Sequence, residues 1–270
     1  MIPVHYAVKI AYLGKYFHGS QRQPEVQTVE GEMIRVLEGI GAIGGPDMAD
    51  FRSAGRTDKG VSALGNLVSF HSEMPAQSLF PALSANLKHV FPISYAEVGP
   101  DFNPRRAVER WYRYHLQDTG QDFEIMKQAA SLFKGYNDFS RFAKVEADRN
   151  PMRRVNDVSI SKQRDGFFVF DVRGESFLWN MVRRMVMAIS MAGSGECSAG
   201  DIKSALAYDS KEAGGVVFPP LPPDGLILMD VVYKEKFTPI TLNIRRERIE
   251  GELRELALEQ RVVSTILENL

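Results

Sequence analysis

The stretch Ser53-Ala54-Gly55-Arg56-Thr57-Asp58-Lys59-Gly60-Val61-Ser62-Ala63-Leu64-Gly65 organises the rest of this chain. It places a carboxylate, an arginine and three glycines in a short run between residues 48–52 and an apolar segment at 66–71. Glycine accepts positive φ and close approach of other backbone, so the run predicts a tight turn that holds Asp58 by backbone geometry rather than by side-chain packing. An aspartate in such a turn is a candidate reactive group, although Asp followed by Lys-Gly is also a common structural turn.

Composition places the chain among ordinary globular proteins. Of its 270 residues, 44% are hydrophobic and 25% are charged, which is enough to bury one large core or two smaller ones. No window reaches the roughly 18 apolar residues of a membrane span, and residues 1–6 lack the layout of a signal peptide. We therefore expect a cytoplasmic protein that has no membrane partner.

Metal and disulfide chemistry is not expected. The single cysteine, Cys197, excludes an internal disulfide and a cysteine-based zinc site. The five histidines show no spacing that is typical of a metal site. We expect neither a metal nor a cofactor.

Hydrophobic periodicity predicts the same order of elements twice. The alternation from Val4 to Tyr12 is typical of a half-buried strand, and Thr28 and Asp122 are plausible N-caps of amphipathic helices. In the first half we expect strands at 4–12, 49–53, 66–71 and 93–98, and helices at 28–40 and from near Pro81 to Val90. In the second half we expect strands at 111–116, 154–162, 167–173 and 226–233, and helices at 122–135, at 176–191 capped by Ser176, and from Ser198, where Asp201 completes a capping box.

This order predicts an α+β fold of two ferredoxin-like βαββαβ halves, whose antiparallel sheets lie side by side with a central cleft. We divide the chain into an N-terminal unit at 1–104 that carries Asp58, a C-terminal unit at 105–238, and a helical tail at 239–270. The charge-rich tail is expected to pack on the body or on a second subunit. The net charge of −1 is a mild argument against nucleic acid, but basic residues cluster at 105–113 and 141–154.

Residues 55–61 closely resemble the signature of the tRNA pseudouridine synthase A (TruA-type) family. Further segments between about Ala7 and Tyr233 are similar to other motifs of that family: Tyr12–Gly14, Thr28–Gly31, Phe102–Arg105, Arg110–Tyr114, Phe133–Gly135, Asp138–Phe142, Phe177–Arg183 and Pro223–Leu226. The resemblance implies the pseudouridine synthase fold. The chain departs from the family pattern at Leu13, Ser20, Ser62 and Asn66, and we expect these departures to affect substrate contacts more than chemistry.

The resemblance implies roles for four residues. Asp58 is implied to be the catalytic nucleophile and Arg183 its salt-bridged partner, and an arginine within an otherwise apolar helix usually has a partner. Tyr112 is implied to stack on the target base and is a candidate for proton transfer, although Tyr112 and Tyr114 also fit a strand core. Arg56 is implied to fill the space that a flipped-out base leaves in a helical stem.

The implied reaction is the isomerisation of uridine to pseudouridine in the anticodon stem-loop of tRNA, just 3′ of the anticodon. It involves no redox change and requires no cofactor, and the resemblance suggests a homodimer with tRNA as partner. One alternative is a catalytically silent RNA-binding or tRNA-folding protein, against which the intact set of Asp58, Arg56, Tyr112 and Arg183 argues. Another is a hydrolase with Asp58 as nucleophile, which would normally need a second acid or a metal-binding cluster nearby.

Overall fold

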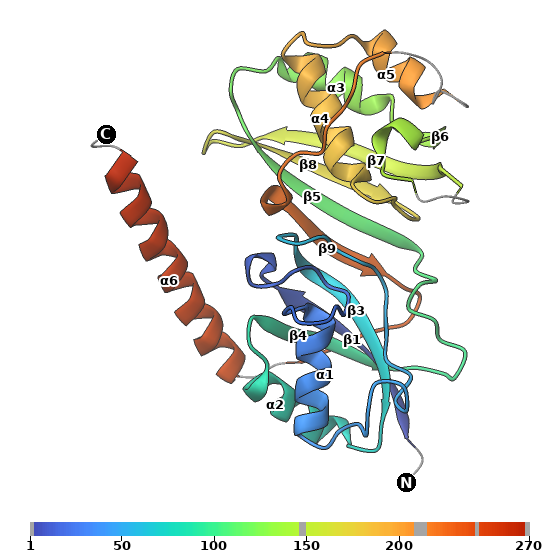
Figure 1. The fold of residues 1–270 in the computed structure, drawn as a ribbon, viewed down its shortest axis with the longest axis vertical. Helices are drawn as coiled ribbons and strands as arrows, with labels where there is room; N and C mark the ends of the chain where they lie inside the picture. The colour runs from blue at the N-terminus through green and yellow to red at the C-terminus, as the bar shows by residue number, and fades with distance from the viewer. Residues whose placement is uncertain (1–2, 146–149, 208–214, 241–242, 268–270) are drawn as a thin grey trace.

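A ten-stranded sheet forms the centre of the molecule, in the order β10-β4-β1-β3-β9-β5-β8-β7-β6 with the short β2 beside β3 (Figure 1). The computed structural model describes residues 3–145, 150–207, 215–240 and 243–267. The strands are β1 (Val4–Tyr12), β2 (Arg52–Ser53), β3 (Ser62–Ser72), β4 (Val90–Glu97), β5 (Glu109–Gln117), β6 (Gly135–Asp138), β7 (Met152–Lys162), β8 (Phe167–Gly174), β9 (Leu226–Val232) and β10 (Thr238–Pro239). The helices are α1 (Val29–Gly39), α2 (Ala76–Asn86), α3 (Phe123–Ser131), α4 (Met181–Gly193), α5 (Ala199–Leu206) and α6 (Asn243–Leu267), with short 3-10 turns η1 (Gly14–Tyr16), η2 (Ser140–Phe142) and η4 (Pro223–Gly225).

The two halves of the chain meet where β9 lies parallel to β3. Ser62 pairs with Ile227 in this short ladder, whereas β1 with β3 and β5 with β9 are antiparallel pairs. Gly65 permits the approach, because a Cβ at this position would lie 2.7 Å from the Met229 carbonyl oxygen. The mixed α+β fold is as predicted, but the sheets expected to lie side by side are not two purely antiparallel sheets. The late strand β9 joins them into one mixed sheet.

Helix starts follow the predicted capping residues in three places. Thr28 and Asp122 each accept a hydrogen bond from the backbone N three residues further on, at 3.2 and 3.0 Å. Ser198 does the same at 3.2 Å, and the Asp201 carboxylate accepts from the Ser198 backbone N at 2.8 Å. These caps satisfy backbone donors that the first turn of a helix leaves open, so the starts of α1, α3 and α5 are confirmed.

Other elements differ from the prediction. Helix α2 begins at Ala76, so Pro81 lies inside it rather than at its start. Helix α4 begins at Met181 instead of after Ser176, because Asn180 takes a left-handed conformation that separates the preceding segment from the helix. The periodicity also does not predict the edge strand β6, which pairs with β7.

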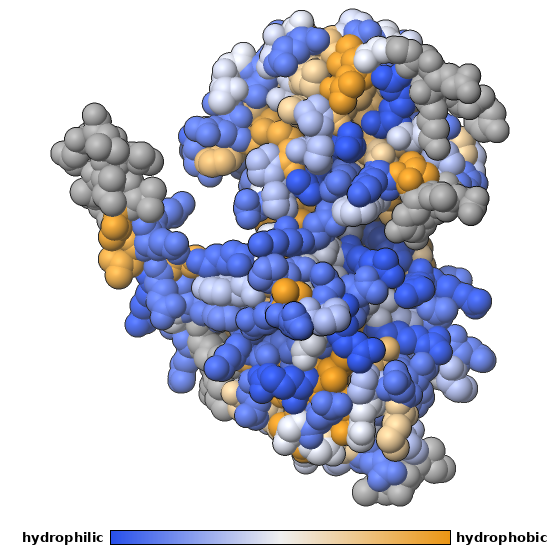
Figure 2. Space-filling model, viewed as in Figure 1, coloured by the Kyte–Doolittle hydropathy of each residue, from blue (hydrophilic) through white to orange (hydrophobic). Residues whose placement is uncertain are grey.

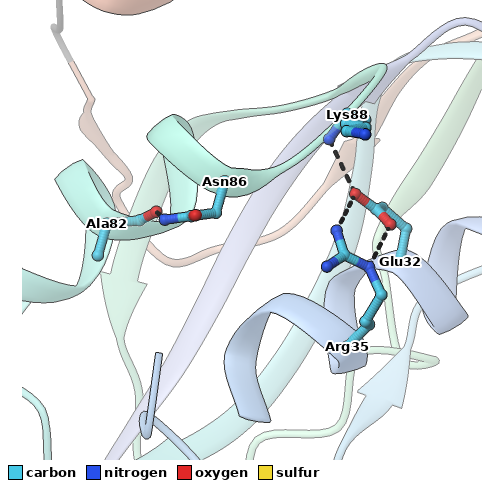
Figure 3. Close-up of polar contacts among 5 residues, drawn as sticks. All are labelled: Glu32, Arg35, Ala82, Asn86 and Lys88. Carbon is cyan, nitrogen blue, oxygen red and sulfur yellow. Dashed lines mark hydrogen bonds and ion pairs between the residues drawn. The ribbon is translucent and has the colours of Figure 1, made fainter. Parts of the chain in front are cut away.

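A buried carboxylate ties α1 to the turn between α2 and β4 (Figure 3). Glu32 accepts hydrogen bonds from Arg35 Nε at 2.9 Å, from Arg35 Nη2 at 2.8 Å and from the Lys88 backbone N at 2.9 Å. Asn86 at the end of α2 donates to the Ala82 carbonyl oxygen at 2.9 Å. Because burial removes water from the Glu32 carboxylate, these donors replace its hydration and link the two helical segments.

Helix α6 carries the tail along one side of the molecule (Figure 1). It contacts the body through Glu252 with His89, at 3.4 Å, and Glu259 with Lys15, at 3.1 Å. Figure 2 shows apolar side chains on this helix, of which three are more than half exposed: Leu253, Leu258 and Val262. Across the described ranges, no helix combines the length and apolar character needed to cross a membrane.

Candidate active site

A cleft of about 1130 Å³ opens where the two halves of the chain meet. It is bordered by the loop at 51–61, by the start of β5 and by the segment at 175–183 that leads into α4. Arg56, Asp58, Tyr112 and Arg183 all line it. Three distant segments therefore bring a carboxylate, a phenol and two guanidinium groups to one space.

Thr57, next to Asp58, is the best-anchored residue of the loop. Its backbone N donates to Ser20 Oγ at 2.8 Å, and its carbonyl oxygen accepts from the Ser20 backbone N at 3.0 Å. Its hydroxyl lies 2.8 Å from the Tyr12 hydroxyl at the end of β1. All three side chains are buried, so these bonds form out of water, where leaving one unmade is costly. The backbone before Asp58 is fixed as a result.

Asn66 extends this network from β3. Its Nδ2 donates to the Tyr12 hydroxyl at 3.1 Å and to the Gly55 carbonyl oxygen at 3.2 Å, and its Oδ1 accepts from the Leu67 backbone N at 2.8 Å. Ser20 and Asn66 are only 2% and 1% exposed. Both departures therefore lie beneath the loop that carries Asp58, where their side chains support it, and their expected effect on substrate contacts stays a prediction.

The turn after Asp58 depends on glycine at one position. Gly60 has φ of 86°, and the Val61 backbone N donates to the Asp58 carbonyl oxygen at 3.1 Å. Glycine adopts this left-handed conformation without steric cost. Gly55 has neither positive φ nor a close neighbour, so the structure does not require glycine at that position, contrary to the prediction. Hydrogen-bonding side chains hold the loop at least as much as backbone geometry does.

Arg183 reaches Asp58 from the first turn of α4. Its Nη1 lies 3.3 Å from Asp58 Oδ2 and 2.9 Å from Asn180 Oδ1, and its Nε donates to the Leu221 carbonyl oxygen at 2.5 Å. Its side chain is 13% exposed and that of Asp58 is 34% exposed. The guanidinium thus lies inside the cleft, in contact with the carboxylate and largely shielded from solvent.

Burial dominates the electrostatics of Asp58. Loss of water raises the pKa of its carboxyl above the ordinary value of 3.8, and this outweighs the opposing charge and hydrogen bond of Arg183 and a hydrogen bond from the Trp179 side chain. A raised pKa means that the carboxylate is weakly solvated and, once ionised, more basic than a surface aspartate. The arrangement provides an anionic group that can attack or stabilise an electron-poor centre.

Tyr112 and Tyr114 occupy different environments although they lie two residues apart on the same strand, on the same face. Burial raises the pKa of each hydroxyl to about 12, so both are neutral at physiological pH. Tyr114 donates to the Pro222 carbonyl oxygen at 2.9 Å, which makes it a structural residue. Tyr112 instead lines the cleft, with the Phe177 ring edge-on at 5.3 Å between centroids. The structure therefore separates the two tyrosines that the sequence pattern left equivalent.

Arg56 and Arg110 differ in how they meet the cleft. Arg56 is exposed at the edge, and in the ranges that the structure describes its side chain forms no ion pair. Arg110 donates to the carbonyl oxygens of Glu175 at 2.5 Å, Ala54 at 3.2 Å and Arg105 at 3.1 Å. Arg110 thus ties three cleft segments together, while Arg56 is available to an incoming ligand.

The two basic clusters seen in the sequence divide between the cleft and other surfaces. Arg113 faces away and pairs with Asp171 at 2.9 Å, whereas the cleft is lined by further cations: Arg22, Arg52, Lys59, Arg105, Arg110 and Arg153. Arg149, from the second cluster, lies outside the described residues. A single face of the molecule therefore concentrates positive charge although the whole chain has a net charge of −1.

Comparison with known proteins identifies the family. A family model described as tRNA pseudouridine synthase matches residues 129–234. A tRNA pseudouridine synthase A from Thermococcus kodakarensis is 44% identical over 229 residues, or 84% of each chain, and one from Thermococcus sibiricus is 40% identical over 265 residues, or 97% of each chain. This chain belongs to the tRNA pseudouridine synthase A family.

A solved Cbf5-Nop10-Gar1 complex has a TM-score of 0.38 and 12% identity, with 68% of this chain and 44% of the other covered. That likeness is too slight to carry an argument. The family prediction made from the Asp58 motif is confirmed by the sequence relatives.

The sequence predicted no role for two residues beside the site, Trp179 and Asn180. Trp179 is 44% exposed and lines the cleft. Lys144 contacts it twice: the Lys144 backbone N donates to the Trp179 carbonyl oxygen at 3.0 Å, and the Lys144 ammonium lies 4.4 Å from the centroid of the Trp179 ring. Asn180 contacts Arg183. The family motif at 177–183 contains both residues, but no periodicity reveals the left-handed backbone at Asn180, just before α4.

Proposed function

We propose that this protein isomerises uridine to pseudouridine in tRNA, with Asp58 as nucleophile and without a cofactor. The observation that carries the proposal is the Asp58 carboxylate, weakly solvated and 3.3 Å from the Arg183 guanidinium, in a cleft lined by further cations. Membership of the family supports the reaction, because the relatives at 40% and 44% identity are named tRNA pseudouridine synthase A.

The chemistry requires a group such as Asp58. The bond between C1′ and N1 of uridine breaks, the uracil turns, and a new bond forms between C1′ and C5. N1 gains a proton and C5 loses one, so atoms and charge balance without an oxidant or reductant. A carboxylate that attacks the substrate, or stabilises positive charge on the sugar, lowers the barrier to the first step much as it does in glycoside cleavage.

The remaining residues have distinct proposed roles. Arg183 keeps the Asp58 carboxylate oriented and ionised, since a nearby cation favours the charged form. Tyr112 offers a neutral ring on which the extruded base stacks, and Arg56 at the open edge enters the space that the base vacates. Extrusion of a paired base costs a few kcal/mol, which contacts of this kind offset.

The substrate is proposed to be the anticodon stem-loop of tRNA, at uridines just 3′ of the anticodon. The cations that line the cleft suit a phosphate backbone, because each contact releases counterions from the RNA. The family resemblance and the exposed apolar side chains of α6 support a further proposal that the protein is a cytoplasmic homodimer. Sedimentation equilibrium of the full chain tests that point independently of activity.

Tritium release from tRNA labelled with [5-³H]uridine tests the proposed reaction, because bond formation at C5 expels the label. Wild type, Asp58→Asn and Asp101→Asn are assayed with a chelator present. Asp101 is an exposed aspartate outside the cleft lining and serves as the matched control. We expect release by wild type and Asp101→Asn, and a loss of at least about 10⁴-fold for Asp58→Asn, as for removal of other nucleophiles.

Binding of unlabelled tRNA by all three proteins is measured in parallel. Turnover by Asp58→Asn at the wild-type rate would rule out Asp58 as the nucleophile. Tight binding by wild type without tritium release from any tRNA would instead favour the RNA-folding alternative.

A further inference from the structure

Asn180 has a backbone conformation that is unusual for a residue with a side chain. Its φ is 65° and its ψ is 4°, in the left-handed region. The described residues contain three other non-glycine residues with positive φ, which are Glu25, Asp50 and His89, and none of these lines the cleft. Asparagine tolerates this region better than most residues, but it still costs free energy relative to glycine.

The side chain of Asn180 does not do what its position predicts. The residue before a helix usually accepts a hydrogen bond from the backbone of the first turn, and Asn180 makes no such bond. Its carbonyl oxygen still accepts from the Arg184 backbone N at 3.0 Å, so the helix starts normally. Its Oδ1 instead accepts from Arg183 Nη1 at 2.9 Å. The amide oxygen therefore binds the arginine side chain and does not cap the helix.

That contact determines how Arg183 meets Asp58. Nη1 carries two hydrogens, and it lies nearer to Asn180 Oδ1, at 2.9 Å, than to Asp58 Oδ2, at 3.3 Å. The Nε bond to the Leu221 carbonyl oxygen fixes the other side of the guanidinium. With Nε and one Nη1 hydrogen engaged, the second Nη1 hydrogen points at the carboxylate. Without the Asn180 amide, only the Leu221 carbonyl oxygen and Asp58 itself would hold the guanidinium.

The segment before α4 is itself anchored, so that Asn180 cannot drift. The Lys144 backbone N bonds the Trp179 carbonyl oxygen at 3.0 Å, in an isolated antiparallel bridge. This bridge holds the residue just before Asn180. The amide oxygen of Asn180 is thus aimed by a fixed backbone on one side and by the start of α4 on the other.

We propose that Asn180 is a positioning residue for the reaction: its left-handed backbone directs its amide oxygen to Arg183, and this contact holds the arginine against Asp58. The inference rests on the proposed roles of Asp58 and Arg183. Glycine would satisfy the backbone but supply no acceptor. Aspartate would supply an acceptor but add a negative charge that competes with Asp58 for the same guanidinium. Asparagine alone meets both requirements.

The pH dependence of the reaction gives a readout that a merely structural role would not change. The charged and titratable groups that line the space around Asp58 come from several elements: Lys15, His18, Arg22, Glu30, Arg52, Arg56, Lys59, Arg105, Arg110, Tyr112, Arg153, Glu175, Arg183 and Asp224. A new carboxylate at position 180 adds to the negative charge near Asp58 and makes ionisation of Asp58 harder. The acidic limb of the activity profile should therefore move to higher pH.

The experiment compares Asn180→Gly, Asn180→Asp and Glu25→Gly with wild type in the tritium-release assay across pH. Glu25 has φ of 61° and lies outside the cleft lining, so Glu25→Gly controls for relief of backbone strain. We expect Asn180→Gly to lower kcat about 10-fold, a scale typical of a small loss of orientation, with KM for tRNA within about twofold of wild type. Asn180→Asp should recover much of kcat at high pH with its acidic limb shifted upward, and Glu25→Gly should match wild type.

Thermal unfolding of each variant separates folding from function. If Asn180→Gly fails to fold, the pH profile of Asn180→Asp decides, and an unshifted acidic limb overturns the proposal. Wild-type kcat in folded Asn180→Gly also overturns it. An inactive Asp58→Asn with a normal Asn180→Gly removes only the role of Asn180, whereas an active Asp58→Asn removes the proposed function itself.

Discussion

The aspartate and the arginine of the site come from different halves of the chain and are held in different ways. Asp58 lies on a loop whose neighbour Thr57 is bonded on three sides by buried groups. Arg183 depends on its own side-chain bonds to Asn180 and to the Leu221 carbonyl oxygen. The aspartate is therefore positioned by the core of the fold, whereas the arginine is positioned by the bonds of its own side chain.

This difference separates the consequences of substitution. A change beneath the Asp58 loop removes buried hydrogen bonds and should lower both stability and activity. A change at Arg183 removes charge from the cleft and should lower activity with less effect on folding.

The largest effect on activity in this series is expected for Arg183→Met. Loss of the cation should lower kcat by about 100-fold or more, as for removal of other preorganised electrostatic groups. The pKa of Asp58 should rise further, which moves the acidic limb of the pH profile to higher pH. Arg184→Met is the matched control, because Arg184 bonds the Phe218 carbonyl oxygen at 2.7 Å and does not line the cleft. Equal activity losses in the two variants would break the comparison.

Asn66→Ala should have the largest effect on stability. It leaves the Tyr12 hydroxyl, the Gly55 carbonyl oxygen and the Leu67 backbone N without their bonds to the Asn66 amide, at a cost of about 1–3 kcal/mol in the free energy of unfolding. Denaturant titration measures this change in the free energy of unfolding. Asn86→Ala is the control, because it loses one exposed bond on α2 (Figure 3). If Arg183→Met destabilises the fold as much as Asn66→Ala, the proposed contrast is wrong.

A smaller effect is expected at Tyr112, which lines the cleft but belongs neither to the loop of Asp58 nor to the helix of Arg183. If its ring stacks on the base, Tyr112→Ala should raise KM for tRNA by about 10-fold, since stacking contributes about 1–3 kcal/mol per base. Tyr112→Phe keeps the ring and should retain most of the activity. A loss of kcat in Tyr112→Phe as large as in Tyr112→Ala would show instead that the hydroxyl, whose pKa is raised to about 12, transfers a proton.

The smallest effect is a pH-dependent change in the stability of Asp58→Asn. The pKa of Asp58 is raised in the folded state, so wild type has its full stability below the unfolded-state pKa and loses part of it as pH rises through the folded-state pKa. Asparagine does not titrate. The Tm of Asp58→Asn relative to wild type should therefore be higher at pH 7 than at pH 3, as differential scanning calorimetry can measure. A difference in the opposite direction would show that Arg183 outweighs burial.

The sequence by itself determined the features that depend on neighbouring residues. The caps at Thr28 and Asp122 and the capping box at Ser198 rest on spacings of a few residues, and all appear in the structure. The strand predicted at 4–12 also forms as β1, but it is not half-buried, because His5 and Ala7 are buried together with the alternating apolar residues. The Asp58 motif was sufficient for the family. The apolar helix around Arg183 also indicated that this arginine would have a partner, because an unpaired buried charge is costly.

Only the tertiary structure decided which distant groups meet. No local period encodes the pairing of β3 with β9, the support of Thr57 by Ser20 and Tyr12, or the contact of Arg183 with Asp58. Each depends on segments far apart in the chain and on backbone conformations that are favourable only once those segments are packed. A buried polar group must find its partner in the folded state, and the folded arrangement alone determines that partner.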